Sequence, residues 1–283
     1  MGTLEERSQQ LKKKRPGYGE ILDFYVKVRK LQFASKVTAE VDIVQAREEW
    51  KHLPAGEGFA LLRKEDFPVD VDAAVSLFQS LCQIGKSATA HMAAEVEKIS
   101  IALNEHKINL QSLLMEGGNE QAIHRAAADL GLDEVVLSFL IQNSIRPSIE
   151  AVREQLQGEL DPETWRRSHC PVCGSLPFLN LLKGEAGKRY SLCSYCSYQW
   201  RIERSSCAFC GNKDQASLEY FHGEGEDAFR IDLCDKCHHY IKTIDYRILE
   251  ASDPCLEDLA TLHLNVIAVK KGYTGVVPNS WSI

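Results

Sequence analysis

Two related stretches of sequence decide the fold of this chain, and they read CPVCGSLPFLNLLKGEAGKRYSLCSYC (residues 170–196) and CAFCGNKDQASLEYFHGEGEDAFRIDLCDKC (residues 207–237). Each stretch begins and ends with a pair of cysteines separated by two residues. Between its pairs, each stretch carries β-prone residues on both sides of a glycine-containing turn. The stretches therefore form an internal repeat, and each copy predicts a β-hairpin that brings two cysteine turns together. The predicted strands are residues 176–182, 189–192, 198–202, 218–221, 228–233 and 240–244.

The paired cysteines have the spacing of metal ligands. Nineteen residues separate Cys173 from Cys193, within the range typical of tetracysteine metal sites, and twenty-three separate Cys210 from Cys234. A ribbon of about forty residues is too small to fold on its own core, and a tetrahedral ion held by four thiolates would supply the missing stability. We predict two such sites with sequential pairing. The ligands are Cys170, Cys173, Cys193 and Cys196 for one ion, and Cys207, Cys210, Cys234 and Cys237 for the other.

Two other arrangements of the cysteines are open at this point. In a cross-brace, the first and third pairs would share one ion. Alternatively, the cysteines could be unligated, although a thioredoxin-like dithiol would be a single pair beside a βαβ unit.

The cysteine turns also raise a question of backbone conformation, because such turns often need a positive φ after the second cysteine. Gly174 and Gly211 suit this position, but Ser197 and His238 occupy it in the second turn of each copy, so those turns must differ or tolerate strain.

The flanking residues predict helices. Ser144 is expected to begin a helix that has Pro147 in its first turn, and residues 52–72 are expected to be a loop because they hold two prolines and two glycines. Asp253 followed by Pro254 begins a last helix that should end near Gly272. Apolar residues recur at helical spacing in three further segments, 21–31, 74–82 and 132–140.

These observations together predict an α+β protein with four parts. They are an all-helical N-terminal domain (1–165), a first metal-binding ribbon (166–206), a second ribbon (207–250), and a C-terminal helix and tail (251–283).

Charge and composition narrow the functional classes. The 283 residues carry a formal net charge of −7, which disfavours nucleic acid as the main partner. The first ribbon is nevertheless basic, and Arg189, Arg201 and Arg204 are expected either to meet an acidic patch of a partner or to face solvent.

No apolar run approaches the ~20 residues of a spanning helix, and the N-terminus lacks the apolar region of a secretory signal, so we expect a cytoplasmic protein. No nucleophile–base set, phosphate loop or dinucleotide fingerprint is present, so we do not predict an enzyme.

Over most of residues 166–273 the sequence resembles the FdhE family of formate dehydrogenase accessory proteins. Four cysteine pairs in this order, with the accompanying aromatic and basic residues, are far more specific than any single pair. The matching features are CPVCGSLP (170–177), Arg189-Tyr190, Trp200, Arg204, CAFCG (207–211), CDKCHHYIK (234–242) and Gly272-Tyr273.

The resemblance implies more than the residues alone predict. It implies a cytoplasmic factor that contacts the catalytic subunit of a respiratory formate dehydrogenase before export and is needed for its activity. It also implies rubredoxin-like ribbons, which favour iron over the zinc that an unassigned ribbon would suggest. Two alternatives stay open, a rubredoxin-like iron electron-transfer partner and, with less support, a zinc-ribbon nucleic-acid-binding protein.

Overall fold

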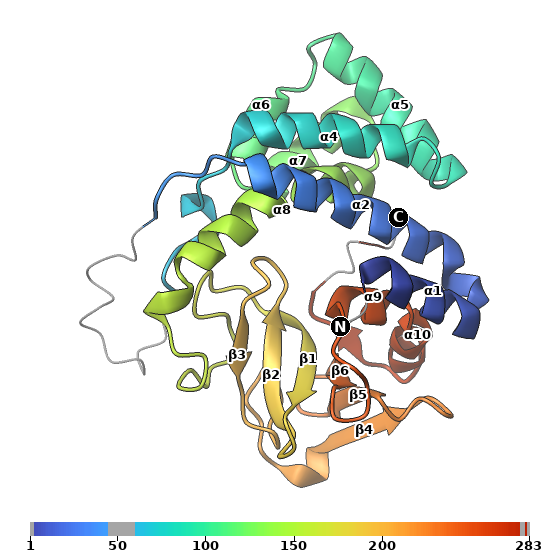
Figure 1. Cartoon of the computed structure of the whole chain (residues 1–283), viewed down its shortest axis with the longest axis vertical. Helices are drawn as coiled ribbons and strands as arrows, with labels where there is room; N and C mark the ends of the chain where they lie inside the picture. Colours follow the sequence, from blue (N-terminus) through green and yellow to red (C-terminus); the bar gives the residue numbers. More distant parts are fainter. Residues whose placement is uncertain (1–2, 45–59, 278–280, 282–283) are drawn as a thin grey trace. The chain divides into compact units, whose positions relative to one another are not determined.

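The computed structural model describes residues 3–44, 60–277 and 281 (Figure 1). The described residues divide into two compact units. The first contains residues 3–22, 60–62 and 157–277, and the second contains residues 23–44, 63–156 and 281. The domain boundaries predicted near residues 165, 206 and 250 all fall inside the first unit and remain predictions. Residues 52–59 of the predicted loop 52–72 lie outside the described residues, and the described remainder contains a short 3-10 helix (Lys64–Asp66) before a helix begins at Val71. Among the helices that are described, none combines the length and apolarity needed to cross a membrane.

The first unit is built on one sheet that both copies of the repeat share. The strands are β1 (Pro177–Lys183), β2 (Lys188–Cys193), β3 (Gln199–Arg201), β4 (Leu218–His222), β5 (Phe229–Cys234), β6 (His239–Asp245) and β7 (Thr274–Gly275). Their order is β3-β2-β1-β6-β5-β4, with β7 beside β6. The six predicted strands are confirmed, each within one residue of its predicted bounds. β1 pairs with β6 in parallel, so the three-stranded antiparallel sheets β3-β2-β1 and β6-β5-β4 join edge to edge.

The core of this sheet crosses the boundary between the copies. Leu181 of β1 and Ile231 of β5 belong to one buried cluster, which Leu264 and Ala268 of helix α10 (Leu262–Lys270) cover. One hydrophobic core therefore serves both ribbons. This sharing explains how two hairpins that are each too short for a core can fold as one body.

The predicted single C-terminal helix is wrong, because the structure contains two helices. Asp253 caps α9 (Pro254–Leu259) as predicted, accepting hydrogen bonds from the backbone of Cys255 and Leu256. The chain then breaks at Thr261 before α10 begins. The buried ammonium group of Lys242 donates to the main-chain oxygens of Asp258 and Thr261, both at 3.0 Å. Each carbonyl also accepts a main-chain N–H, from Thr261 at 3.0 Å and from Leu264 at 3.1 Å, so Lys242 adds a second hydrogen bond to each and stabilises the break.

The N-terminal helix α1 (Leu4–Lys14) packs within the first unit against these C-terminal helices (Figure 1). Arg7 pairs with the buried carboxylate of Glu257 through two hydrogen bonds, of 2.5 and 3.0 Å. Arg15 donates to the carbonyl oxygen of Ala260 at 2.9 Å. The first helix of the chain is therefore held by charged contacts to its last helices.

The second unit is helical, as predicted. Its helices are α2 (Gly19–Thr38), which begins in the first unit, and α4 (Val71–Gly85), α5 (Ala90–Asn104), α6 (Leu110–Met115), α7 (Glu120–Leu130) and α8 (Glu134–Gln155). The predicted helix start at Ser144 is wrong, because α8 continues through Pro147. Proline has no N–H to give to the carbonyl of Asn143. The side-chain amide of Gln32 donates to that carbonyl at 3.0 Å instead.

Candidate metal centres

The first cysteine cluster comprises Cys170, Cys173, Cys193 and Cys196, which the sequence predicts as one ligand set. The Sγ atoms of Cys170 and Cys196 are 3.6 Å apart, and those of Cys173 and Cys193 are 3.4 Å apart. All four sulfurs lie within 4.8 Å of one another, and all four residues are buried. No pair among them is a disulfide.

The second cluster repeats this arrangement in the second copy with Cys207, Cys210, Cys234 and Cys237. The sulfurs of Cys207 and Cys237 are 3.7 Å apart and those of Cys210 and Cys234 are 3.8 Å apart. Again the four sulfurs lie within 4.8 Å of one another. The eight cysteines therefore group in sequential order, each copy closing on itself, and not in the cross-brace order.

Both clusters have dimensions that suit a tetrahedral ion. Four sulfurs placed at ~2.3 Å from a central ion, as in zinc sites, are separated from one another by about 3.8 Å. The separations of 3.4 to 3.8 Å in the structure are close to this value. A disulfide would instead require about 2.05 Å. The residues present therefore fit one four-thiolate ion in each cluster.

All four cysteine turns adopt the same backbone conformation. The residue after the second cysteine has a φ of 74° at Gly174, 59° at Ser197, 68° at Gly211 and 55° at His238. Ser197 and His238 thus tolerate the left-handed region, which costs a non-glycine residue about 1 kcal/mol. Of the two possibilities, that these two turns differ from the glycine turns or that they tolerate strain, the second is the one that occurs. The positive φ is adopted at every cysteine pair.

Main-chain N–H groups point at the sulfurs inside these turns. The N–H of Val172 lies 3.4 Å from the sulfur of Cys170. The N–H of Phe209 lies at the same distance from the sulfur of Cys207 in the second copy. Such contacts stabilise the thiolate form that metal binding requires.

Burial and mutual hydrogen bonding act on the thiols of the first cluster. Burial raises the pKa of Cys170 and Cys196 well above the ordinary value. Burial also opposes ionisation of Cys173, but hydrogen bonds from the neighbouring thiols outweigh it and lower the pKa of Cys173. The buried thiols therefore share protons among themselves. A divalent cation bound between them would displace these protons and allow all four sulfurs to be charged.

The aromatic residues after the second turn are buried. Trp200 is fully buried and its indole N–H donates to the carbonyl oxygen of Arg167 at 2.9 Å. Trp165 is also buried and donates to the carbonyl oxygen of His169 at 2.7 Å. The Trp200 bond holds residues 165–169 against β3, and the Trp165 bond closes this segment on itself directly ahead of Cys170.

Arg189 is expected from the sequence either to contact a partner or to face solvent, and this prediction is wrong because its side chain is buried. It is 3% exposed and donates to the main-chain oxygen of Ser206 at 2.7 Å. It also lies 3.4 Å from a carboxylate oxygen of Asp232. Burial lowers the pKa of Arg189, and Asp232 opposes that shift. Arg189 therefore joins the two copies. Arg201 instead pairs with Glu163 at 3.1 Å, and Arg204 is exposed.

Family models, related sequences and a solved structure that are similar to this chain all carry the same family name. Residues 169–204 match the family model described as FdhE, central domain, and residues 205–281 match FdhE, C-terminal domain. A protein FdhE homolog of Aquifex aeolicus is 26% identical over 275 residues, which are 95% of this chain and 90% of that protein. A protein FdhE homolog of Shewanella oneidensis is 33% identical over 112 residues, which are 39% of this chain and 37% of that protein. The crystal structure of the FdhE protein from Pseudomonas aeruginosa has the same fold, with a TM-score of 0.70 at 22% identity, covering 98% of this chain and 93% of that one.

Proposed function

Because the chain belongs to the FdhE family, we propose that it is a formate dehydrogenase accessory protein. In this role it binds the catalytic subunit of a respiratory formate dehydrogenase in the cytoplasm and is needed for the activity of that enzyme. The observation that carries the proposal is the presence of two four-sulfur clusters on one shared sheet, within the residues that match the two family domains. The binding of the subunit is the part of the proposal that follows from family resemblance.

Each cluster is proposed to hold one metal ion. The ligands of the first ion are the four cysteines of the first cluster, and those of the second ion are the four cysteines of the second cluster. The sulfur separations accept either zinc or iron, and the family resemblance favours iron. Four protein ligands fill a tetrahedral shell, so no position is open for substrate or water. We therefore assign a binding role to the protein and no catalytic step.

A second candidate function has support from one observation. Cys210 is exposed, so an iron ion in the second cluster would have a ligand sulfur at the surface, where a redox partner could approach. An electron-transfer role requires a reversible one-electron couple in the iron-loaded protein. A zinc-loaded protein that restores full biological activity would rule this role out.

The accessory role is tested by deleting the gene in its own organism and measuring formate oxidation with an artificial electron acceptor. We expect most of the activity to be lost, and to return when the wild-type gene is supplied. A tagged protein should also retain the catalytic subunit on a column under anaerobic, reducing conditions. The Cys170→Ser variant should fail in both assays, whereas Cys255→Ser, outside the clusters, should behave like wild type. Full formate dehydrogenase activity in the deletion strain contradicts the proposal.

A further inference from the structure

The internal repeat gives each residue of the first cluster a counterpart in the second, so the surroundings of the two clusters can be compared position by position. Cys173 is 5% exposed, whereas its counterpart Cys210 lies exposed at the surface. Cys196 is fully buried, whereas its counterpart Cys237 is only partly buried. At both positions solvent reaches the second cluster and is kept from the first.

A covering segment explains the difference at the first turn of each copy. The main-chain N–H groups of Leu61 and Leu62 donate to the carbonyl oxygens of Pro171 and Val172 at 2.8 and 2.9 Å. Leu61 and Leu62 are themselves buried. This segment therefore lies along the first cysteine turn as an added layer of main chain.

The glycines of the two turns show the effect of this layer. A Cβ atom placed on Gly174 would lie 3.6 Å from the Cβ of Ala60, which belongs to the covering segment. A Cβ atom placed on Gly211, its counterpart, would have no described atom within 4 Å. The first turn is thus packed against protein, and the second faces open space.

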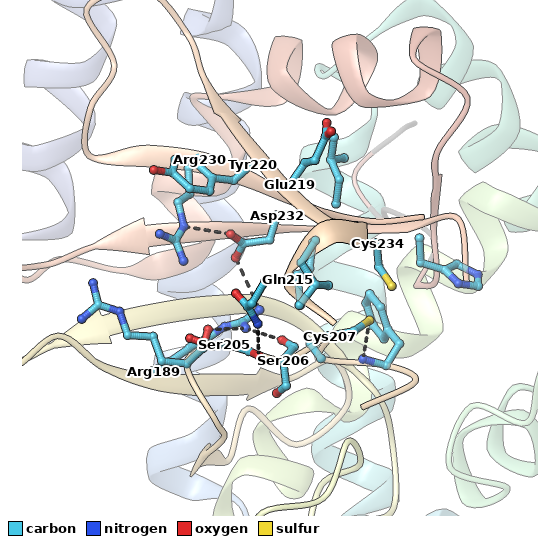
Figure 2. A pocket seen from close by; sticks show the side chains of 17 residues that line it. Arg189, Ser205, Ser206, Cys207, Gln215, Glu219, Tyr220, Arg230, Asp232 and Cys234 are labelled. Atoms are coloured by element: carbon cyan, nitrogen blue, oxygen red, sulfur yellow. Dashed lines mark hydrogen bonds and ion pairs between the residues drawn. The ribbon is translucent and has the colours of Figure 1, made fainter. Parts of the chain in front are cut away.

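A pocket also reaches the second cluster from its other side. It has a volume of about 290 Å³, and Cys207 and Cys234 are among the residues that line it (Figure 2). This volume is room for several water molecules, each of which takes about 30 Å³ in the liquid. A small reagent can therefore approach the sulfurs of Cys207 and Cys234 through this pocket, whereas the sulfurs of the first cluster are buried.

Charged side chains line this pocket. Arg230 and Arg189 are paired with the same carboxylate, that of Asp232, at 2.9 and 3.4 Å. One carboxylate thus faces two guanidinium groups. The charged residues that line the pocket are Arg189, Arg204, Arg230, Glu219 and Asp232. Three guanidinium groups and two carboxylates therefore line the approach to Cys207 and Cys234, which makes the approach polar and accessible to a water-soluble reagent.

From these differences we infer that the second cluster is a readily exchangeable metal site, open to small chelators, while the first cluster releases its ion much more slowly. The inference rests on the proposed binding of two ions. In the exchange, bonds between the ion and the cysteine sulfurs are replaced by bonds to the oxygen or nitrogen atoms of the chelator. The released thiolates take up protons from solvent, and the oxidation state of the ion does not change.

The test uses the full chain loaded with two zinc ions and mixed with 4-(2-pyridylazo)resorcinol, an anionic chelator whose zinc complex is coloured. We expect release in two phases of one ion each, with the first about tenfold or more faster, which corresponds to a barrier about 1.4 kcal/mol lower. N-ethylmaleimide added during the fast phase should label cysteines of the second cluster and leave the first cluster unlabelled in peptide mass spectra. Cys82, which is buried, should stay unlabelled throughout.

A variant separates the two ions. Cys210→Ser removes an exposed ligand, so it should abolish the fast phase and leave the slow phase unchanged. Release of both ions at one rate, or earlier labelling of the first cluster, overturns the inference while leaving the proposed metal binding intact. A carefully reduced chain that binds no ion at all contradicts the metal binding itself, and with it this inference.

Discussion

The ammonium nitrogen of Lys242 lies 2.7 Å from a carboxylate oxygen of Asp258. The lysine side chain is 2% exposed, and it extends from β6 to the end of α9. A buried charge of this kind is tolerated only when it is paired and its hydrogen bonds are satisfied. This lysine therefore ties the last strand of the second copy to the C-terminal helices that cover the shared sheet.

Replacing this lysine should weaken the whole first unit. Lys242→Met leaves the carboxylate of Asp258 without the ammonium group that pairs with it. We expect a loss of about 3 kcal/mol in the free energy of unfolding, as for other buried ion pairs broken on one side. Denaturant unfolding of the metal-loaded protein measures it. Lys270→Met, at an exposed position of α10, is the control and should change stability by about 0.5 kcal/mol or less.

Metal removal should affect the two units differently. The first unit depends on the clusters because each hairpin is short, whereas the second unit has a core of packed helices such as α4 and α8. After chelation under reducing conditions, hydrogen exchange should lose protection across β1 to β6 and keep it in α4 and α8. Restoring zinc should restore the sheet. A metal-free protein with a fully protected sheet contradicts the proposed structural role of the ions.

The strained turn at His238 offers a stabilising substitution. His238 has a φ of 55° and an exposed side chain. Glycine adopts this conformation without a steric penalty, so His238→Gly should raise the free energy of unfolding by up to about 1 kcal/mol. His238→Ala keeps the strain and should not do so. Equal thermal stability of the two variants would show that the strain is not relieved by removing the Cβ atom.

Local patterns predicted the strands and the cysteine clusters because each signal is contained within one copy of the repeat. What they missed depends on distant partners. Proline rules placed a helix start at Ser144, but Gln32, 111 residues from Asn143 in sequence, supplies the donor that lets α8 continue. Likewise, the sequence predicts Arg189 as a surface residue, but the fold places Asp232 of the second copy and the main-chain oxygen of Ser206 beside it. The pairing of β1 with β6 is likewise not indicated by any local sequence pattern, because the two strands come from different copies of the repeat.

The helical unit should be sensitive to acid through Glu150. Burial alone would raise the pKa of Glu150, but Arg146 and Arg29 outweigh burial and lower it. Because the folded state then binds a proton less readily than the unfolded state, stability is present above pH about 4.5, the ordinary range of a glutamate, and is lost as the pH falls below it. Glu150→Gln should be less stable than wild type at pH 7, and the difference should shrink as the pH falls. A difference that stays constant with pH contradicts this assignment.

A double-mutant cycle tests how α8 passes through Pro147. Gln32→Leu should cost about 1–3 kcal/mol, because the buried carbonyl of Asn143 loses the side-chain donor that replaces the missing N–H of Pro147. Pro147→Ala restores a main-chain N–H that can donate to the same carbonyl. The loss caused by Gln32→Leu should therefore be smaller in the Pro147→Ala background, giving a coupling of about 1 kcal/mol between the sites. Gln32 also contacts the side chain of Asn143 at 3.0 Å, and Asn143→Ala in both backgrounds removes that contribution from the comparison. Additive effects of the two substitutions would mean that the continuity of α8 has another cause.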